Sequence, residues 1–312
     1  MATLRSEGTT LRIETDRYTA AVETEGYVSG VARQSFVDRA TGAHDLGFGL
    51  AVADFLLEPE WDDIWTDAQA GSHRYLRDPL LHGNLPRRYV ELPQICTQAK
   101  RLPYQMITGP GFVGVRQWFQ WTEATAGRTP GSRWEQTLVF PDGVRYFLAA
   151  DRITSANDVE CLLFRQDMPG HLRHHGGDTF TQVFLSTQGL IPAAAFLQDF
   201  PPDARYLYHR DVDPIPGRLI RAYQVRLPDG RPGPWLAGMT LDPTVVCEAW
   251  CHQRGYVCFI QEIGGFRIHR GETLAAAHVI GWFDDLEAMY AVCDQYRGAL
   301  GIEVDASGYR LV

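Results

Sequence analysis

The sequence predicts a mainly β fold, a large antiparallel β-sandwich over residues 1–312 with one helix near the C-terminus. Segments rich in β-branched and aromatic residues recur along the chain, and Gly, Pro, Asp and Asn separate them. The strongest helix signal lies near the C-terminus and few helices separate the strands, so a repeating βαβ architecture is excluded. We expect a single domain, because no low-complexity linker or internal repeat interrupts the chain.

The predicted strands are spread over the whole chain. They cover residues 11–14, 18–23, 27–33, 48–57, 113–121, 133–140, 144–150, 159–165, 179–186, 219–227, 235–241, 245–252, 256–262 and 273–283. Residues 58–111 and 189–217 lack a strand pattern and are predicted as long loops. Loops of that length on a rigid sandwich usually carry function.

The predicted helix follows the last of these strands. Apolar residues from Leu286 to Leu300 keep a 3.6-residue spacing. Asp284 and Asp285 precede them as cap candidates, and Gly301 follows as a stop signal. We expect this helix to pack an apolar stripe against the sandwich.

Composition narrows the classes of partner and the location. A formal net charge of −9 disfavours nucleic acid and anionic membrane surfaces, because either would need a concentrated basic face. No apolar stretch reaches 18 residues and the N-terminus lacks a signal-peptide pattern, so we expect a cytoplasmic protein. The six cysteines are scattered through apolar segments and are predicted to be reduced.

The first candidate site lies in the long loop 58–111. This loop concentrates side chains that suit a sugar, since aromatic rings stack on its C–H faces and polar groups pair with its hydroxyls. The substrate-binding candidates from this region are Trp65, His82, Arg87, Arg88, Tyr89 and Gln98. A long surface loop that merely satisfies its own polar groups is the alternative.

The second candidate site is the cluster RQDMPGHLRHHGGDTF, residues 165–180. Arg165 is a substrate-binding candidate, and His171, His174 and His175 are candidate acids or bases, because histidine titrates near neutral pH. The spacing of His171, His174 and Asp178 could hold a divalent metal. It lacks the helical register of known zinc motifs, so we expect neither a metal nor another cofactor. An exposed polar hairpin tip is the alternative.

The third candidate site is a predicted hairpin over residues 245–262. Strand alternation places Glu248, Trp250 and His252 on one face, and Cys247, Ala249 and Cys251 on the other. The return strand presents Tyr256, Cys258, Ile260 and Glu262 together. A carboxylate, an indole and an imidazole on one face would suit acid/base chemistry beside a stacking platform. Zinc is not expected, because no paired C-x-x-C is present.

Motifs for other chemistry are missing. The chain has no G-x-S-x-G elbow, no G-x-x-x-x-G-K-[ST] loop and no strand-linked G-x-G-x-x-G. Acyl transfer and nucleotide chemistry are therefore disfavoured.

The segment YVCFIQEIGGFRIHRGETLAAAHVIGWF, residues 256–283, resembles the C-terminal part of aldose 1-epimerases. The strand rhythm of most of the chain likewise resembles the galactose-mutarotase-like β-supersandwich superfamily. The resemblance implies that Glu262 takes the place of the family's catalytic glutamate, which is the base, and that Gly271-Glu272 forms the turn after it. It further implies that a histidine of the middle loop, His171, His174 or His175, is the acid.

Three functions remain open, all with a sugar or oligosaccharide as partner. The first is a sugar epimerase or mutarotase that uses Glu262 and a histidine, with Arg88 and Arg165 orienting hydroxyls and Trp250 stacking on the ring. The second is a uronate lyase in which arginines neutralise the carboxylate and Tyr89, Tyr256 or a histidine removes a proton. The third is a carbohydrate-binding protein without catalysis. Fold alone does not choose among them.

Overall fold

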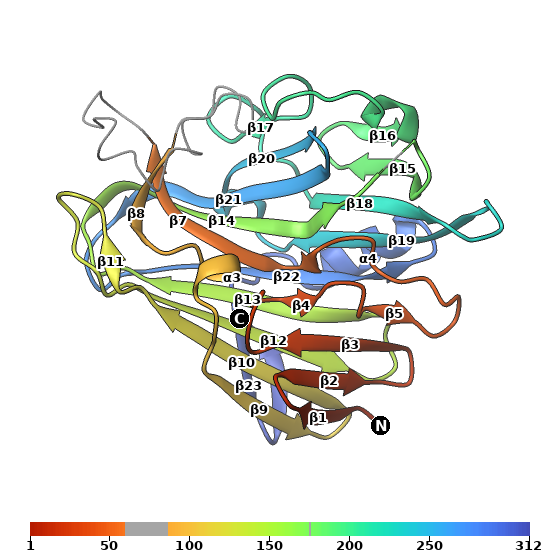
Figure 1. Cartoon of the computed structure of the whole chain (residues 1–312), viewed down its shortest axis with the longest axis horizontal. Helices are drawn as coiled ribbons and strands as arrows, with labels where there is room; N and C mark the ends of the chain where they lie inside the picture. The colour runs from red at the N-terminus through yellow and green to blue at the C-terminus, as the bar shows by residue number, and fades with distance from the viewer. Residues whose placement is uncertain (60–86, 175) are drawn as a thin grey trace.

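The structure is a computed structural model that describes residues 1–59, 87–174 and 176–312 (Figure 1). It is built from two large antiparallel sheets and a smaller N-terminal sheet, with a short helix close to the C-terminus. The predicted fold class, a mainly β antiparallel sandwich, is confirmed. None of the helices in the described ranges combines the length and the apolar run that crossing a bilayer requires.

The larger sheet has nine strands in the order β16-β15-β18-β19-β22-β13-β12-β10-β9. Its strands are β9 (Tyr104–Gly109), β10 (Phe112–Gln120), β12 (Arg133–Pro141), β13 (Tyr146–Thr154), β15 (Phe180–Leu185), β16 (Gly189–Pro192), β18 (Leu219–Arg226), β19 (Pro232–Thr240) and β22 (Thr273–Phe283). Helix α4 (Leu286–Gln295) and the hairpin of β23 (Ile302–Asp305) and β24 (Gly308–Leu311) share an apolar cluster with one face of this sheet.

The second sheet has seven strands in the order β11-β8-β7-β14-β21-β20-β17. They are β7 (Val52–Pro59), β8 (Arg87–Leu92), β11 (Glu123–Ala124), β14 (Val159–Leu172), β17 (Tyr208–His209), β20 (Val246–Gln253) and β21 (Val257–Ile268). Leu56, Phe164 and Ile263 of this sheet share one buried cluster with Trp134 and Ile153 of the nine-stranded sheet. The two sheets therefore enclose a common core.

The remaining elements complete the sandwich (Figure 1). They are the four-stranded sheet of β1 (Thr3–Glu7), β2 (Thr10–Glu14), β3 (Tyr18–Glu23) and β5 (Val37–Asp38), the pair β4 (Val31–Ala32) and β6 (Gly49–Leu50), helix α3 (Ile95–Gln98), and the 3-10 turns η2 (Ala193–Phe196) and η3 (Pro243–Val245).

The loop predictions need correction. Residues 58–111 contain β8, α3 and β9, and residues 189–217 contain β16, η2 and β17. The charged and polar residues of β8 hid it from a search for apolar alternation, since Arg87 and Glu91 are buried through pairing rather than exposed. Strand β14 also runs to Leu172, past the predicted end at 165, so His171 is a strand residue.

The C-terminal helix begins as predicted but ends early. Asp285 caps it, and its side chain accepts a hydrogen bond of 2.8 Å from the backbone N–H of Ala288. The helix stops at Gln295, five residues before Leu300. Gly298, rather than Gly301, takes the left-handed conformation just beyond the end, with φ of 82°.

A chain of buried polar side chains links the two large sheets. Gln166 of β14 donates to Asp151 of β13 at 2.6 Å, and Gln261 of β21 donates to Gln166 at 3.0 Å. Arg221 of β18 donates to Gln261 at 2.9 Å. Burial raises the pKa of Asp151 to about 7 and lowers that of Arg221 to about 9. The two glutamine amides thus bridge an acid and a cation inside the core.

Candidate active site

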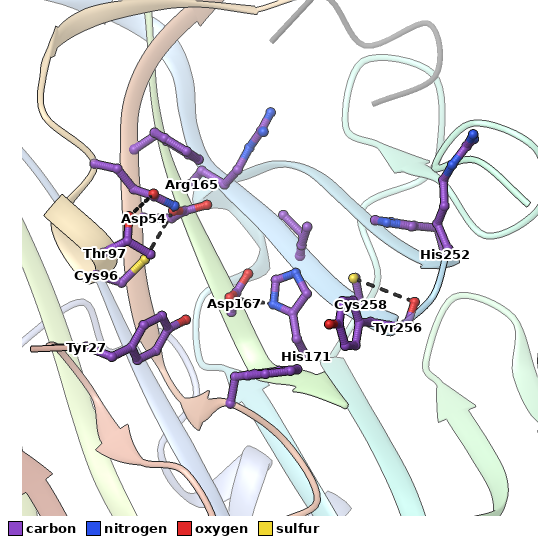
Figure 2. Close-up of a pocket in the computed structure, with 15 residues that line it drawn as sticks. Tyr27, Asp54, Cys96, Thr97, Arg165, Asp167, His171, His252, Tyr256 and Cys258 are labelled. Atoms are coloured by element: carbon purple, nitrogen blue, oxygen red, sulfur yellow. Dashed lines mark hydrogen bonds and ion pairs between the residues drawn. The ribbon is translucent and has the colours of Figure 1, made fainter. Parts of the chain in front are cut away.

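The seven-stranded sheet has an outer face, turned away from the nine-stranded sheet. Gln166 and Gln261 point inward, so their neighbours in the alternation, Arg165, Asp167 and Glu262, point outward. A pocket of about 370 Å³ lies on this outer face. It is lined by Tyr27, Phe48, Asp54, Phe55, Gln94, Cys96, Thr97, Arg165, Asp167, His171, His252, Arg254, Tyr256, Cys258 and Ile260 (Figure 2).

The predicted alternation of the hairpin is confirmed by the register of β20 and β21. Glu248 lies opposite Glu262, Trp250 opposite Ile260, and His252 opposite Cys258. Directly opposite residues of a pair share a face, so all six belong to the outer face. Cys247 is an exception to the prediction. A register shift between Val246 and Glu248 turns it to an apolar cluster with Phe55 and Leu163 instead of the core.

Asp167 and His171 form the closest acid–base pair of the pocket. Oδ2 of Asp167 lies 2.5 Å from Nδ1 of His171. Burial alone would lower the pKa of His171, but the charge of Asp167 and this hydrogen bond raise it well above its usual range. The contact with Asp167 therefore favours the protonated form of His171. Oδ1 of Asp167 is buried and has no hydrogen-bond partner in the described ranges, so it can accept a bond from a ligand hydroxyl.

Asp54 of β7 is a second carboxyl group in the pocket. Gln94 and Cys96, at the start of α3, donate hydrogen bonds to its Oδ1. Burial, and then the nearby charge of Asp167, raise the pKa of Asp54 to about 7. In Figure 2 Asp167 lies between Asp54 and His171. The pocket thus holds an imidazole whose pKa is raised and a carboxyl group whose pKa is raised to about 7.

The raised pKa of Asp54 predicts a pH-dependent stability. An unfolded Asp ionises near pH 4, whereas folded Asp54 keeps its proton to about pH 7, so stability falls as pH rises through this window. Asp54→Asn removes this loss. We expect the free energy of unfolding of the variant, relative to wild type, to rise by about 2 kcal/mol between pH 5 and pH 7. Urea unfolding at both pH values measures it.

Asp178→Asn serves as the control, because Asp178 is exposed. Its free energy of unfolding relative to wild type should stay constant between the two pH values. The same constancy in Asp54→Asn would show that Asp54 is ionised throughout and would remove it as a neutral-pH proton carrier.

Glu262 lies beneath the pocket in a buried ion-pair network. Its Oε2 accepts from Nε of Arg87 at 2.8 Å, and its Oε1 accepts from Nη2 of Arg165 at 2.5 Å. Arg87 also pairs with Glu248 at 2.7 Å. Burial works to raise the pKa of Glu262, but the two guanidinium charges outweigh it and the pKa is lowered. Glu262 is thus a carboxylate held in place.

The structure brings some predicted site residues together and separates others. His171, Tyr256, Arg165 and His252 line the pocket. Glu262, Arg87 and Trp250 form a buried layer around Arg165, whose guanidinium carbon lies 5.3 Å from the Trp250 ring centroid. Trp250 is 1% exposed, so its ring packs on Arg165 and not on an open surface.

Four predicted residues lie away from the pocket. Arg88 pairs with Glu58 at 2.7 Å, and Tyr89 packs on Phe55 with ring centroids 5.2 Å apart. The side chain of Gln98 accepts from the backbone N–H of Gln94. His174 is buried against Phe180, with ring centroids 3.7 Å apart. Trp65, His82 and His175 lie outside the described residues.

Sequence reasoning missed Asp54, and it placed Asp167 and Cys258 in candidate clusters without giving either a catalytic or binding role. Asp54 is the one charged residue in the apolar run FGLAVADFLL, residues 48–57. A carboxyl group buried in such an apolar run either has a partner or has a shifted pKa. This exception in the apolar pattern was the signal that could have identified Asp54. Asp167 lies two residues after Arg165 and so shares its face, a relation that needed the true length of β14.

One group in the described ranges has metal-ligand chemistry, formed by His209, Cys247 and Glu248 within 4.8 Å of one another. His209 Nε2 lies 3.2 Å from Glu248, and its Nδ1 accepts from the backbone N–H of Asp211 at 3.1 Å. The acceptor role of Nδ1 places the proton of a neutral ring on Nε2, which leaves no lone pair for an ion. His171 and His174 engage different partners, Asp167 and Thr179. The expectation of no cofactor stays a prediction.

No protein-family model matches the chain, and no curated protein matches it in sequence. Its structure is similar to galactose 1-epimerase from Lactobacillus acidophilus NCFM, at 8% identity and a TM-score of 0.46, over 90% of this chain and 98% of that one. It is also similar to 4-alpha-glucanotransferase from Thermococcus litoralis, at 10% identity and a TM-score of 0.42, over 90% of this chain and 39% of that one.

A third similar structure is a quadruple mutant of alpha-N-acetylgalactosaminidase from Bifidobacterium bifidum, at 12% identity and a TM-score of 0.42, over 96% of this chain and 40% of that one. The chain thus spans well under half of the glucanotransferase and of the galactosaminidase. TM-scores of this size carry no argument about family, activity or substrate. The geometry of the pocket therefore has to carry the functional argument.

Proposed function

We propose that this protein is an acid/base enzyme that interconverts the anomers of a sugar in the outer-face pocket. The observation that carries the proposal is that one pocket holds two candidate proton carriers, His171 in contact with Asp167 and the carboxyl group of Asp54, whose pKa is raised to about 7. Proton transfer at neutral pH needs such matched groups. The sequence resemblance to aldose 1-epimerases supports the same reaction.

The lining of the pocket supports a sugar as the substrate. Phe48, Tyr256 and Phe55 offer aromatic faces for C–H groups of a ring, and Phe48 meets Tyr256 edge-on at 5.1 Å. Asp167 and His252 each hold a buried polar atom that has no hydrogen-bond partner in the described ranges. Sugar hydroxyls can both donate to and accept from such atoms.

The reaction follows from the two protonation states. Asp54, as a carboxylate, removes the proton of the anomeric hydroxyl, while His171 donates its proton to the ring oxygen. The bond between the anomeric carbon and the ring oxygen breaks, and an open-chain aldehyde forms. Rotation about the neighbouring C–C bond and reversal of both proton transfers give the other anomer and restore both groups. General acid–base catalysis of this kind contributes about 10²–10⁴-fold.

Glu262 receives a different role in this proposal. The sequence predicts it as the base, but its two oxygens are engaged by Arg87 and Arg165, and it is not among the residues that line the pocket. We assign the base to Asp54. Glu262 is then a positioning residue that fixes the guanidinium of Arg165 at the pocket wall.

Exchange NMR on wild-type protein with neutral aldoses, uronates and their oligomers tests the proposal. We expect cross-peaks between the α and β anomeric protons of one sugar class, and at least a 100-fold slower exchange with Asp54→Asn. Asp178→Asn should exchange at the wild-type rate. Ligand binding without exchange would favour a binding protein, and new absorbance from an unsaturated uronate would favour the lyase. Either result would overturn the proposal that this protein interconverts sugar anomers.

A further inference from the structure

One end of the pocket is formed where three adjacent strands end. Val257, the first residue of β21, pairs with the last residue of β14 on one side and with the last residue of β20 on the other. The next residue outward on each strand is Arg173, Tyr256 or Arg254. The register therefore places the two arginines on either side of Tyr256, in a rim row of the three residues Arg173, Tyr256 and Arg254.

The rim row shares the outer face of the sheet with the pocket. Its members lie two residues beyond His171, Cys258 and His252, which line the pocket, and residues two apart on a strand point to the same face. Tyr256 and Arg254 line the pocket themselves, and Figure 2 shows Tyr256 next to Cys258. Two residues along a strand span about 7 Å. One sugar unit can therefore reach from the candidate acid His171 to the rim row.

Arg173 is held against two aromatic rings of the pocket wall. Its guanidinium carbon lies 5.4 Å from the ring centroid of Phe48 and 5.7 Å from that of Tyr256. Both rings line the pocket. A guanidinium group that stacks on aromatic faces keeps the N–H groups at its edge free to donate. The two rings therefore orient Arg173 without using its hydrogen bonds.

The two arginines of the rim row have no anionic partner within the described ranges. Arg173 is exposed and Arg254 is half-buried, and neither side chain pairs there with a carboxylate or donates a hydrogen bond. By contrast, Arg165 of the pocket wall is paired with Glu262 at 2.5 Å. The rim row thus offers two cations for a ligand, in a chain whose formal net charge is −9.

His252 adds a buried polar group beside the rim row. It is 6% exposed, and its Nδ1 has no hydrogen-bond partner in the described ranges. Burial, together with the charge of His171, lowers the pKa of His252 to about 3, so the ring is neutral and carries one N–H. A buried polar group without a partner costs free energy. A ligand that accepts a hydrogen bond from His252 would remove this cost.

We propose that the pocket selects a sugar that carries an anionic group, a carboxylate or a phosphate monoester, which Arg173 and Arg254 bind and to which His252 donates a hydrogen bond. Guanidinium groups suit both anions, since their N–H groups match carboxylate and phosphate oxygens in pairs. The anionic group lies at the rim row, and the anomeric carbon lies near His171 and Asp54. The sugar part of this ligand rests on the proposed function, whereas the anion site is defined by binding alone.

Isothermal titration calorimetry tests this selectivity with the methyl glycosides of glucose, galactose and mannose, and with the uronate and the 6-phosphate of each. A methyl glycoside cannot open its ring, so binding is measured without turnover. We expect the uronate or the 6-phosphate of one sugar to bind at least about 10-fold more tightly than its neutral counterpart, which identifies the anion. Arg173→Gln and Arg254→Gln should each remove most of this advantage and leave the affinity for the neutral sugar nearly unchanged. Arg152→Gln, at an exposed arginine of β13, should keep the wild-type affinities.

Equal affinity for the neutral sugars and their acidic counterparts would overturn the inference, and so would the absence of binding by every acidic sugar. An advantage that persists in the folded double variant of Arg173→Gln and Arg254→Gln would remove the rim row as the anion site. Circular dichroism establishes that each variant is folded. Arginine-dependent binding without anomer exchange would remove the proposed function and keep the anion site, whereas exchange confined to neutral aldoses would do the reverse.

Discussion

Replacing Glu262 by Gln is expected to lower the free energy of unfolding by about 3–5 kcal/mol. Glu262 is fully buried, and its carboxylate is bound by the side chains of Arg87 and Arg165, which are 6% and 1% exposed. Removing one negative charge leaves these guanidinium groups buried with less compensation. Guanidinium-chloride unfolding followed by tryptophan fluorescence measures the loss.

Glu160→Gln is the matched control for this prediction. Glu160 and Arg267 also join β14 to β21, at 2.5 Å, but their side chains are 67% and 59% exposed. Water screens an exposed pair, so its removal should cost at most about 1 kcal/mol. Equal losses in the two variants would contradict the structural role of Glu262. Unchanged stability together with lost activity would return Glu262 to the role of base.

Replacing His171 by Gln is expected to lower kcat for anomer exchange by about 10²–10⁴-fold and to change KM much less. Gln is of similar size and keeps polar contacts, but it cannot deliver a proton from a charged form. The substrate is the sugar that the exchange panel identifies, and the rate is measured by exchange NMR. Near-UV circular dichroism shows whether the pocket keeps its packing.

His174→Gln separates the histidines that the sequence leaves as equal candidates. His174 lies three residues further along, but its ring stacks on Phe180 and its Nδ1 meets Thr179 at 2.7 Å, away from the pocket. We expect its kcat to stay within a few-fold of wild type. A loss as large as that of His171→Gln in a folded protein would remove His171 as the acid.

Much of the sheet framework was predictable from the sequence, because buried strands carry local signals. Strands β3 and β22 coincide with the predicted ranges 18–23 and 273–283. Strand β8 was not predictable in this way, because Arg87 and Glu91 are buried there through ion pairing and hydrogen bonds with residues far along the chain. Such partners have no signature in the sequence around β8.

The candidate site was predictable in its strands and less so in its chemistry. Alternation correctly grouped Glu248, Trp250 and His252, since a period of two follows from strand geometry alone. The same rule could not show that Glu262 lies under a guanidinium layer while Cys258 faces the pocket. This difference between Glu262 and Cys258 depends on which elements cover each end of β21, the strand that holds both residues.

The polar chain from Asp151 to Arg221 has a consequence for how new chemistry arises on this scaffold. Along β14 and β21, inward glutamines alternate with residues of the outer face. Neighbouring positions therefore contact different surroundings, the core on one side and the pocket side of the sheet on the other. The inward amides fix how the strands align, because a slip by one residue would bring charged groups into the core. Outward positions outside the ion-pair network of Arg87, Arg165 and Glu262 carry no such constraint. At those positions the scaffold can change its reactivity without changing how its strands align.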